Sequence, residues 1–123
     1  MNQDMQTDRP QLFIELFNYK PEWKALAVAE RQAFADRLAV GVEKMPQLGI
    51  EVIAWGVNDR RTDRRAPYDF FCVYRLVSVD ALRRFEAGIA SSDWYRYFDQ
   101  VAVSGDAGSP HMMMEVCVAL GEP

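Results

Sequence analysis

The sequence predicts a single α+β domain, and three observations lead to this fold class. The chain has 123 residues, about the size of one domain with its own core. Half of the residues are hydrophobic and 26% are charged, as in ordinary globular proteins. The periodicity of apolar residues changes along the chain in the order strand, helix, strand, strand, helix, strand. We therefore expect a ferredoxin-like βαββαβ fold, a four-stranded antiparallel sheet with the helices on one face.

The first half of the chain predicts a tail, a strand and a helix. Residues 1–11 are polar and indicate a flexible N-terminal tail, so the domain should span residues 12–120. Residues Leu12–Tyr19 are rich in aromatic and aliphatic side chains, as is typical of a strand. A helix is predicted over Val28–Met45, because apolar residues recur there on one stripe. This stripe consists of Phe34, Leu38, Val42 and Met45.

The second half predicts three strands around a broken helix. Strands are expected at Ile50–Val57 and Tyr68–Val77, joined by an arginine-rich connection over residues 58–67. Ser78 can cap the next helix, whose apolar stripe is Leu82, Phe85 and Ile89. Two serines then interrupt it before a second helical piece over Asp93–Val101. A flexible connector at 104–110 leads to a last strand at His111–Leu120.

Each predicted strand carries a charged residue on one face, and these are Glu15, Glu51, Arg75 and Glu115. The other residues of these faces include many large apolar side chains, among them Phe13, Phe17, Ile53, Trp55, Phe71 and Val73. Leaving several of them in water would forgo several kcal/mol, at about 25 cal/mol per Å². We therefore expect helices on one sheet face and a second copy of the chain on the other. The interface of this homodimer should be the charge-bearing face or, failing that, its opposite.

Several segments resemble a known superfamily: FIELFNYKPEW, AERQAF, IEVIAWGVND, YDFFCVYRL and WYRYFDQV. They are similar to a small uncharacterised bacterial branch of the dimeric α/β-barrel superfamily, whose members pack two ferredoxin-like sheets face to face. The resemblance covers residues 12–120 and implies this fold. The superfamily includes cofactor-independent monooxygenases, lactone isomerases, dehydratases, haem-binding proteins and ligand-binding modules, so the fold implies no single reaction.

Composition excludes several classes of function. The net charge of −4 argues against a nucleic-acid partner, and no apolar run is long enough to span a membrane. The N-terminus lacks the apolar stretch of a secretory signal, so we expect a cytoplasmic protein. Cys72 and Cys117 lie in apolar runs and are expected to be reduced core thiols. With a single histidine the chain cannot form a multi-histidine zinc site, and we expect neither a metal nor a cofactor.

The candidate catalytic residues are Glu15 and His111. A strand carboxylate that is desolvated can act as a general base, and histidine titrates near neutral pH. The alternative is that the strand carboxylates lie at sheet edges or pair with Arg75, and that His111 is an exposed residue at a strand start.

The candidate ligand-binding residues are Asn18, Trp55, Trp94 and Tyr97. They should border a pocket between the helices and the sheet for a small apolar or aromatic ligand. The aromatic residues could instead be ordinary core packing. Two functions follow from these residues: a cofactor-independent enzyme of monooxygenase, isomerase or cyclase type acting on an aromatic or polyketide-like molecule, or a noncatalytic binding or accessory homodimer. Whether the protein is an enzyme stays open at this point.

Overall fold

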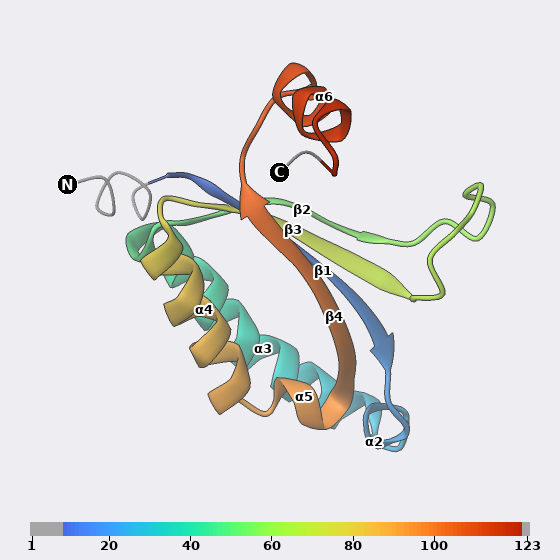
Figure 1. The fold of residues 1–123 in the computed structure, drawn as a ribbon. Coiled ribbons are helices and arrows are strands. Elements are labelled where there is room, and N and C mark those ends of the chain that lie inside the picture. Colours follow the sequence, from blue (N-terminus) through green and yellow to red (C-terminus); the bar gives the residue numbers. More distant parts are fainter. Residues whose placement is uncertain (1–8, 122–123) are drawn as a thin grey trace.

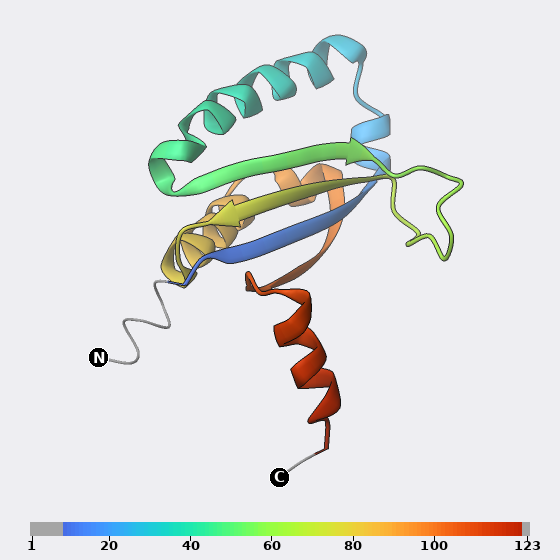
Figure 2. The same cartoon turned by 90° about the horizontal axis from the view of Figure 1, so that it is seen from above.

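The computed structural model describes residues 9–121, so most of the predicted tail lies outside the described residues. Within this range, four strands form one antiparallel sheet. Helices α3 (Val28–Lys44), α4 (Val79–Ser91) and α5 (Trp94–Tyr97) lie on one side of the sheet (Figure 1). Helix α6 (Pro110–Val118) projects away from this helical layer. Figure 2 shows that the connection after the second strand extends beyond the end of the sheet.

The sheet has the order β2-β3-β1-β4, which confirms the ferredoxin-like α+β fold. Its strands are β1 (Gln11–Tyr19), β2 (Ile50–Val57), β3 (Phe70–Leu76) and β4 (Phe98–Asp106). β1 lies at the centre and pairs antiparallel with both β3 and β4, while β2 pairs with β3 at the other edge. The first three strands agree with their predicted positions to within two residues.

The two long helices also form where their apolar stripes predict them. In α3, Phe34 is buried while Leu38 and Val42 are half-buried, and the next residue of the stripe, Met45, is buried in the 3-10 turn η1 (Met45–Leu48). Helix α4 begins after Ser78, whose Oγ accepts a hydrogen bond from the Ala81 N–H at 3.1 Å. The short helix α2 (Pro21–Lys24) begins at a proline, where a missing N–H has no cost.

The prediction of a last strand at His111–Leu120 is wrong, because these residues form α6 and the fourth strand is β4. The Ser109 Oγ accepts a hydrogen bond from the Met112 N–H at 3.2 Å, and Pro110 occupies the first helical turn, which are helix-start signals. Apart from His111 and Glu115 the segment is apolar, so periodicity does not separate strand from helix there. Of the predicted helix Asp93–Val101, only α5 is helical, and β4 begins directly after it. The connector predicted at 104–110 overlaps the last residues of β4.

A β-bulge at Ile53 changes which residues of β2 share a face. The pairing shifts between Val52 and Ala54, so one extra residue lies between them. Trp55 therefore lies opposite Cys72, while Glu51 lies opposite Arg75 on the other face. The expectation that Trp55 shares a face with Glu51 is corrected by this bulge.

The two faces of the sheet differ in what covers them. The helix-covered face carries Phe13, Glu15 and Phe17 of β1 together with Cys72 and Tyr74 of β3, all at most 3% exposed. The side chains opposite to them form what we call the open face. Its apolar residues are Leu12, Ile14, Leu16, Phe71, Val73, Val101 and Val103, and Glu51 and Arg75 lie on the same face. The charged faces of β1 and β3 thus point to opposite sides of the sheet.

Gly49 joins η1 to β2 in a conformation that other residues avoid. Its φ is +78°, and a Cβ atom there would lie 2.6 Å from Cγ2 of Val77. We expect Gly49→Ala to lower the free energy of unfolding by about 1–3 kcal/mol in urea denaturation. The matched control is Gly41→Ala in α3, where nothing lies within 4 Å of the added atom. The free energy of unfolding of that variant should rise by about 0.5–1 kcal/mol. Equal effects of the two changes would contradict this role of Gly49.

Candidate functional site

A cavity of about 70 Å³ lies between the sheet and the helical layer, the region in which the sequence predicts a pocket. All four helical or turn segments that cover the sheet and three of the strands contribute to its walls. The lining residues are Glu15, Leu38, Met45, Trp55, Tyr74, Phe85, Ile89, Ser92 and Trp94. The walls are mainly apolar with a few polar groups, as in small-molecule sites, although such sites are usually larger, roughly 300–1,000 Å³.

Glu15 is the ionisable group of this cavity with the most unusual environment. It sits in the middle of the central strand, and its side chain is 2% exposed. Burial disfavours its charged form and raises its pKa from 4.5 to about 7, although hydrogen bonding from Tyr74 and Gln100 opposes this shift. Its Oε2 atom has no hydrogen-bond partner among residues 9–121. Glu15 can therefore exchange a proton near neutral pH, as a general base requires.

Tyr74 and Cys72 of β3 lie beside Glu15 of the neighbouring strand β1, on the same face of the sheet. Burial raises the pKa of the Cys72 thiol to about 12 and raises the pKa of the Tyr74 hydroxyl above its usual range. Both groups are consequently neutral at physiological pH, and Tyr74 can serve as a hydrogen-bond donor rather than as a base. Sequence reasoning missed Tyr74 and Gln100, although alternation places Tyr74 and Cys72 on one face of their strand.

Trp94 forms the wall of the cavity at the break between α4 and α5. Its ring packs on Phe98 at 4.2 Å and edge-on against Phe17 at 5.1 Å between ring centroids. The Ser92 Oγ accepts a hydrogen bond from the backbone N–H of Trp94 and so fixes the start of α5. The indole Nε1, in contrast, is buried and has no hydrogen-bond partner in the described part of the chain.

An outer hollow of about 240 Å³ adjoins the cavity on the side of α3. It shares Leu38, Ser92 and Trp94 with the cavity, so these three residues separate the two spaces. Phe34 and Arg37 line its other side. A displacement of the Trp94 side chain would therefore enlarge the inner space toward the helical surface.

The structure brings together three of the six predicted site residues, Glu15, Trp55 and Trp94. Asn18 is not at the cavity, and its Nδ2 donates a hydrogen bond to the carbonyl oxygen of Pro67 at 3.1 Å. The ring of Tyr97 packs against Trp23 and Phe34 instead of lining the cavity.

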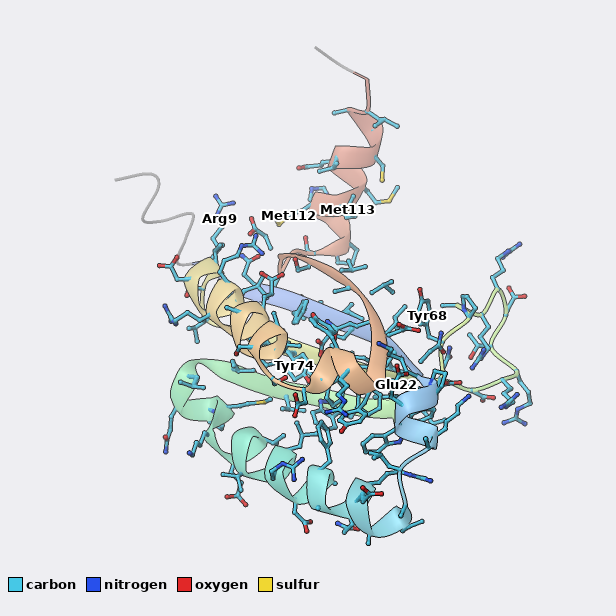
Figure 3. The ribbon with its side chains drawn as sticks, turned by 90° about the horizontal axis from the view of Figure 1, so that it is seen from below. Arg9, Glu22, Tyr68, Tyr74, Met112 and Met113 are labelled. Carbon is cyan, nitrogen blue, oxygen red and sulfur yellow. The ribbon has the colours of Figure 1, made fainter. Side chains whose placement is uncertain are left out.

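His111 lies on α6, away from the cavity lining. Its side chain is 85% exposed, and its Nε2 lies 3.0 Å from Oε1 of Glu115. The alternative of an exposed histidine therefore holds, but His111 lies on a helix and not at the start of a strand. Cys117 is likewise exposed on α6 and is not the core thiol that the sequence predicts. Figure 3 shows the side chains of α6, with Met112 and Met113 labelled, well separated from Tyr74.

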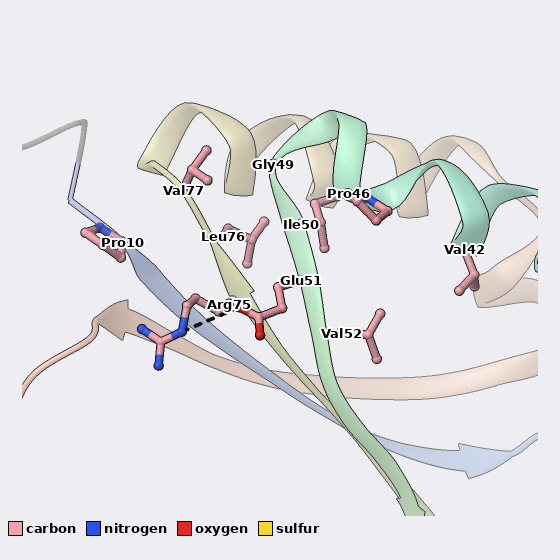
Figure 4. Close-up of a pocket in the computed structure, with 10 residues that line it drawn as sticks. All are labelled: Pro10, Val42, Pro46, Gly49, Ile50, Glu51, Val52, Arg75, Leu76 and Val77. Carbon is pink, nitrogen blue, oxygen red and sulfur yellow. Dashed lines mark ion pairs between the residues drawn. The ribbon is translucent and has the colours of Figure 1, made fainter.

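A larger hollow of about 610 Å³ lies beside the first residues of β2 (Figure 4). Glu51 and Arg75 approach to 3.9 Å there, so the alternative of cross-strand pairing holds for these two residues. Both side chains are about half exposed or more, and solvent screens their interaction. The buried carboxyl group of the smaller cavity is the stronger indication of chemistry.

Clusters of metal-ligating side chains and membrane-spanning helices are both absent from residues 9–121, the part of the chain that the structure describes. This part of the chain contains no cluster of three His, Cys, Asp or Glu side chains that could hold a metal ion. None of its helices is long and apolar enough to cross a membrane.

Two solved structures share the fold of this chain. RPA0582 of Rhodopseudomonas palustris, described as a protein of unknown function, is 16% identical with a TM-score of 0.54, covering 84% of this chain and 85% of that chain. A mutant chlorite dismutase from Candidatus Nitrospira defluvii is 14% identical with a TM-score of 0.59. The match covers 93% of this chain and 49% of the chlorite dismutase chain. This chain therefore spans about half the length of the chlorite dismutase. At these identities the likeness concerns the fold alone.

The sequence comparisons identify a family but no activity. No curated protein matches this chain. The model of one protein family matches residues 10–120, which include β1 to α6 and every residue that lines the cavity. The chain belongs to the family of unknown function DUF6616.

Proposed function

We propose that this protein is a cofactor-independent enzyme in which Glu15 takes a proton from a small, mainly apolar molecule. One observation carries this proposal: a carboxyl group that is 2% exposed, with a pKa raised to about 7 by burial, lines a cavity. A structural carboxylate in such a position would be expected to have an Arg or Lys partner, because an uncompensated buried charge is costly. No Arg or Lys lines this cavity within the described residues. Burying Glu15 without such a partner is therefore costly to folding, and a costly buried ionisable group is typical of functional sites.

The size of the cavity limits the molecule that can bind. At about 70 Å³ it accommodates a compact molecule, whereas a polyketide would require Trp94 to move toward the outer hollow. Trp55, Phe85 and Trp94 would contact the apolar part of the ligand. An isomerase type of reaction fits best, since proton abstraction and return need only one acid–base group.

The test is an untargeted deuterium-incorporation experiment. The protein is incubated in D₂O with a small-molecule extract of bacterial cells, and compounds that gain deuterium or change mass are detected by mass spectrometry. After return to H₂O, which removes deuterium from oxygen and nitrogen, we expect at least one compound to retain more carbon-bound deuterium with the wild-type protein than without protein, and no such excess with Glu15→Gln. Equal incorporation with both proteins would contradict the role of Glu15.

A noncatalytic binding protein is the second candidate, and the protonated form of Glu15 that burial favours supports it. In that case Glu15 would be protonated and would donate a hydrogen bond to a ligand. Native mass spectrometry would then detect a compound bound to the wild-type protein that stays chemically unchanged during incubation in D₂O. The two candidates thus differ in whether the bound molecule exchanges hydrogen with the solvent.

We further propose that the functional form is a homodimer assembled through the open face. Val101 and Val103 of this face are 45% and 66% exposed in the single chain. On α6, Met112, Met113, Met114, Val116 and Val118 are all more than half exposed. Contiguous apolar surface of this kind is typical of an interface, and a second copy offers the same apolar surface in return.

The change Val103→Asp should convert this dimer into a monomer. Val103 lies beside Ile14 on the open face, and Ile14 lies beside Val73, so a carboxylate in place of Val103 would lose its hydration among apolar neighbours in the interface. Analytical ultracentrifugation at micromolar concentration should give about twice 14.1 kDa for the wild type and 14.1 kDa for the variant. The control is Val40→Asp, which introduces the same charge at a 53% exposed position of α3. It should remain dimeric, and a monomeric wild type would overturn the proposal.

A further inference from the structure

We propose that the ligand of the Glu15 cavity is a compact, uncharged cyclic ketone, whose carbonyl oxygen accepts a hydrogen bond from the Trp94 indole N–H while the neighbouring C–H faces the Glu15 carboxylate. This inference rests on the proposed function, in which Glu15 is a base. It adds the chemical class of the substrate and a role for Trp94.

Two buried polar atoms of opposite character point to this class. Three buried side-chain atoms have no partner within the described range: the donor Trp94 Nε1 and the acceptors Glu15 Oε2 and Gln100 Oε1. Of these three residues, Trp94 and Glu15 line the cavity and Gln100 does not. A buried polar group without a partner costs about 1–3 kcal/mol, so each such group in a folded protein requires an explanation. Both residues line the same cavity, and a single ligand can therefore satisfy both. Such a ligand needs an acceptor for Trp94 and a removable proton for Glu15.

The walls of the cavity indicate a ring without charge. Trp55, Phe85 and Ile89 offer flat and aliphatic contacts, which suit an apolar ring. A ligand carboxylate or phosphate would face the Glu15 carboxylate with no cationic side chain in the described lining to balance it. The volume of about 70 Å³ is below the roughly 150 Å³ of a cavity that binds benzene, so even a five-membered ring requires the Trp94 side chain to move toward the outer hollow.

The reaction expected from this arrangement is a proton shift between carbon atoms through an enolate, and it balances without a co-reactant. The Glu15 carboxylate takes a proton from the carbon next to the carbonyl group, and the C–H bond breaks. Its electron pair forms the new C=C bond, while the carbonyl π electrons move to the oxygen. The Trp94 N–H stabilises the negative oxygen, as donors of an oxyanion hole do. Glu15 then returns its proton to carbon, at the same or at a conjugated position.

Cyclopentanone in D₂O is a direct probe of both groups. Deuterium gain at the carbons beside the carbonyl is measured by mass spectrometry at pH 8, where Glu15 is ionised. We expect exchange above the buffer rate with the wild-type protein, loss of this excess with Glu15→Gln, and a reduction of about 100- to 1,000-fold with Trp94→Phe. The phenyl ring keeps an aromatic wall but removes the N–H donor. Trp23→Phe serves as control, because Trp23 packs on Phe98 outside the cavity lining.

A second readout follows binding without chemistry. In a ¹H–¹⁵N spectrum of protein labelled at tryptophan, cyclopentanone should shift the Trp94 indole N–H signal, because its carbonyl oxygen accepts a hydrogen bond. Cyclopentane has no acceptor and should not produce the shift that this hydrogen bond causes. Wild-type protein that neither exchanges cyclopentanone nor shifts this signal would overturn the inference. Trp94→Phe that exchanges as fast as the wild type would overturn it too, while loss with Glu15→Gln would still support Glu15 as the base. Exchange by Glu15→Gln at the wild-type rate would instead overturn the proposed function.

Discussion

Glu15→Gln is expected to make the folded protein more stable above neutral pH, by about 3 kcal/mol. The folded-state pKa of Glu15 is raised from 4.5 to about 7, so folding favours the protonated carboxyl group. Its contribution to stability is complete below pH 4.5 and is lost as the pH rises through 7, because the buried group must then ionise. A shift of this size corresponds to about 3 kcal/mol. Glutamine has a similar shape and cannot ionise, so the variant avoids this cost.

The measurement is urea unfolding of both proteins between pH 4 and pH 8. The difference in unfolding free energy should be small at pH 4 and should grow between pH 4.5 and pH 7. Glu43→Gln on α3 is the control, because Glu43 is exposed there and the change should leave the pH dependence as it is. Parallel curves for the wild type and Glu15→Gln would show that Glu15 is not desolvated.

Leu76→Ala is expected to cost about 2–5 kcal/mol of stability, since it leaves a cavity under the helices. Leu76 is 0% exposed on the helix-covered face of β3, where it lies opposite Gln11 and Ile50. The same substitution at Leu48, which is 59% exposed in η1, should change stability by no more than about 0.5 kcal/mol. Thermal and urea unfolding of the two variants measure this contrast. Similar losses in both would contradict the assignment of this face of β3 to the core.

The sequence predicts most of the fold because most of its segments have a clear period. Phe34, Leu38 and Val42 indicate α3 correctly, and alternation around Glu15 indicates β1. At the C-terminus the apolar run from His111 to Leu120 fits both a strand and a helix, and only Ser109 and Pro110 signal the helix start that the structure has. The strand β4 is hidden because its end, with Gly105 and Asp106, has the composition of a loop.

The site is predicted less completely than the fold, for two physical reasons. Alternation groups residues by face but does not say which face the helices cover, and the bulge at Ile53 reverses the direction of Trp55. Contacts between distant segments are the second reason. The approach of Gln100 to Glu15 depends on the pairing of β1 with β4, and the exposure of His111 depends on α6. Neither follows from local sequence.

A titration of the Glu15 side-chain carboxyl carbon by ¹³C NMR tests the central claim most directly. The spectrum of Glu15→Gln identifies the signal, and its chemical shift is followed from pH 3 to pH 9. Burial in the cavity predicts a midpoint near 7. A midpoint near 4.5, the ordinary value of a glutamate side chain, would contradict both the desolvation of Glu15 and its proposed role as a base.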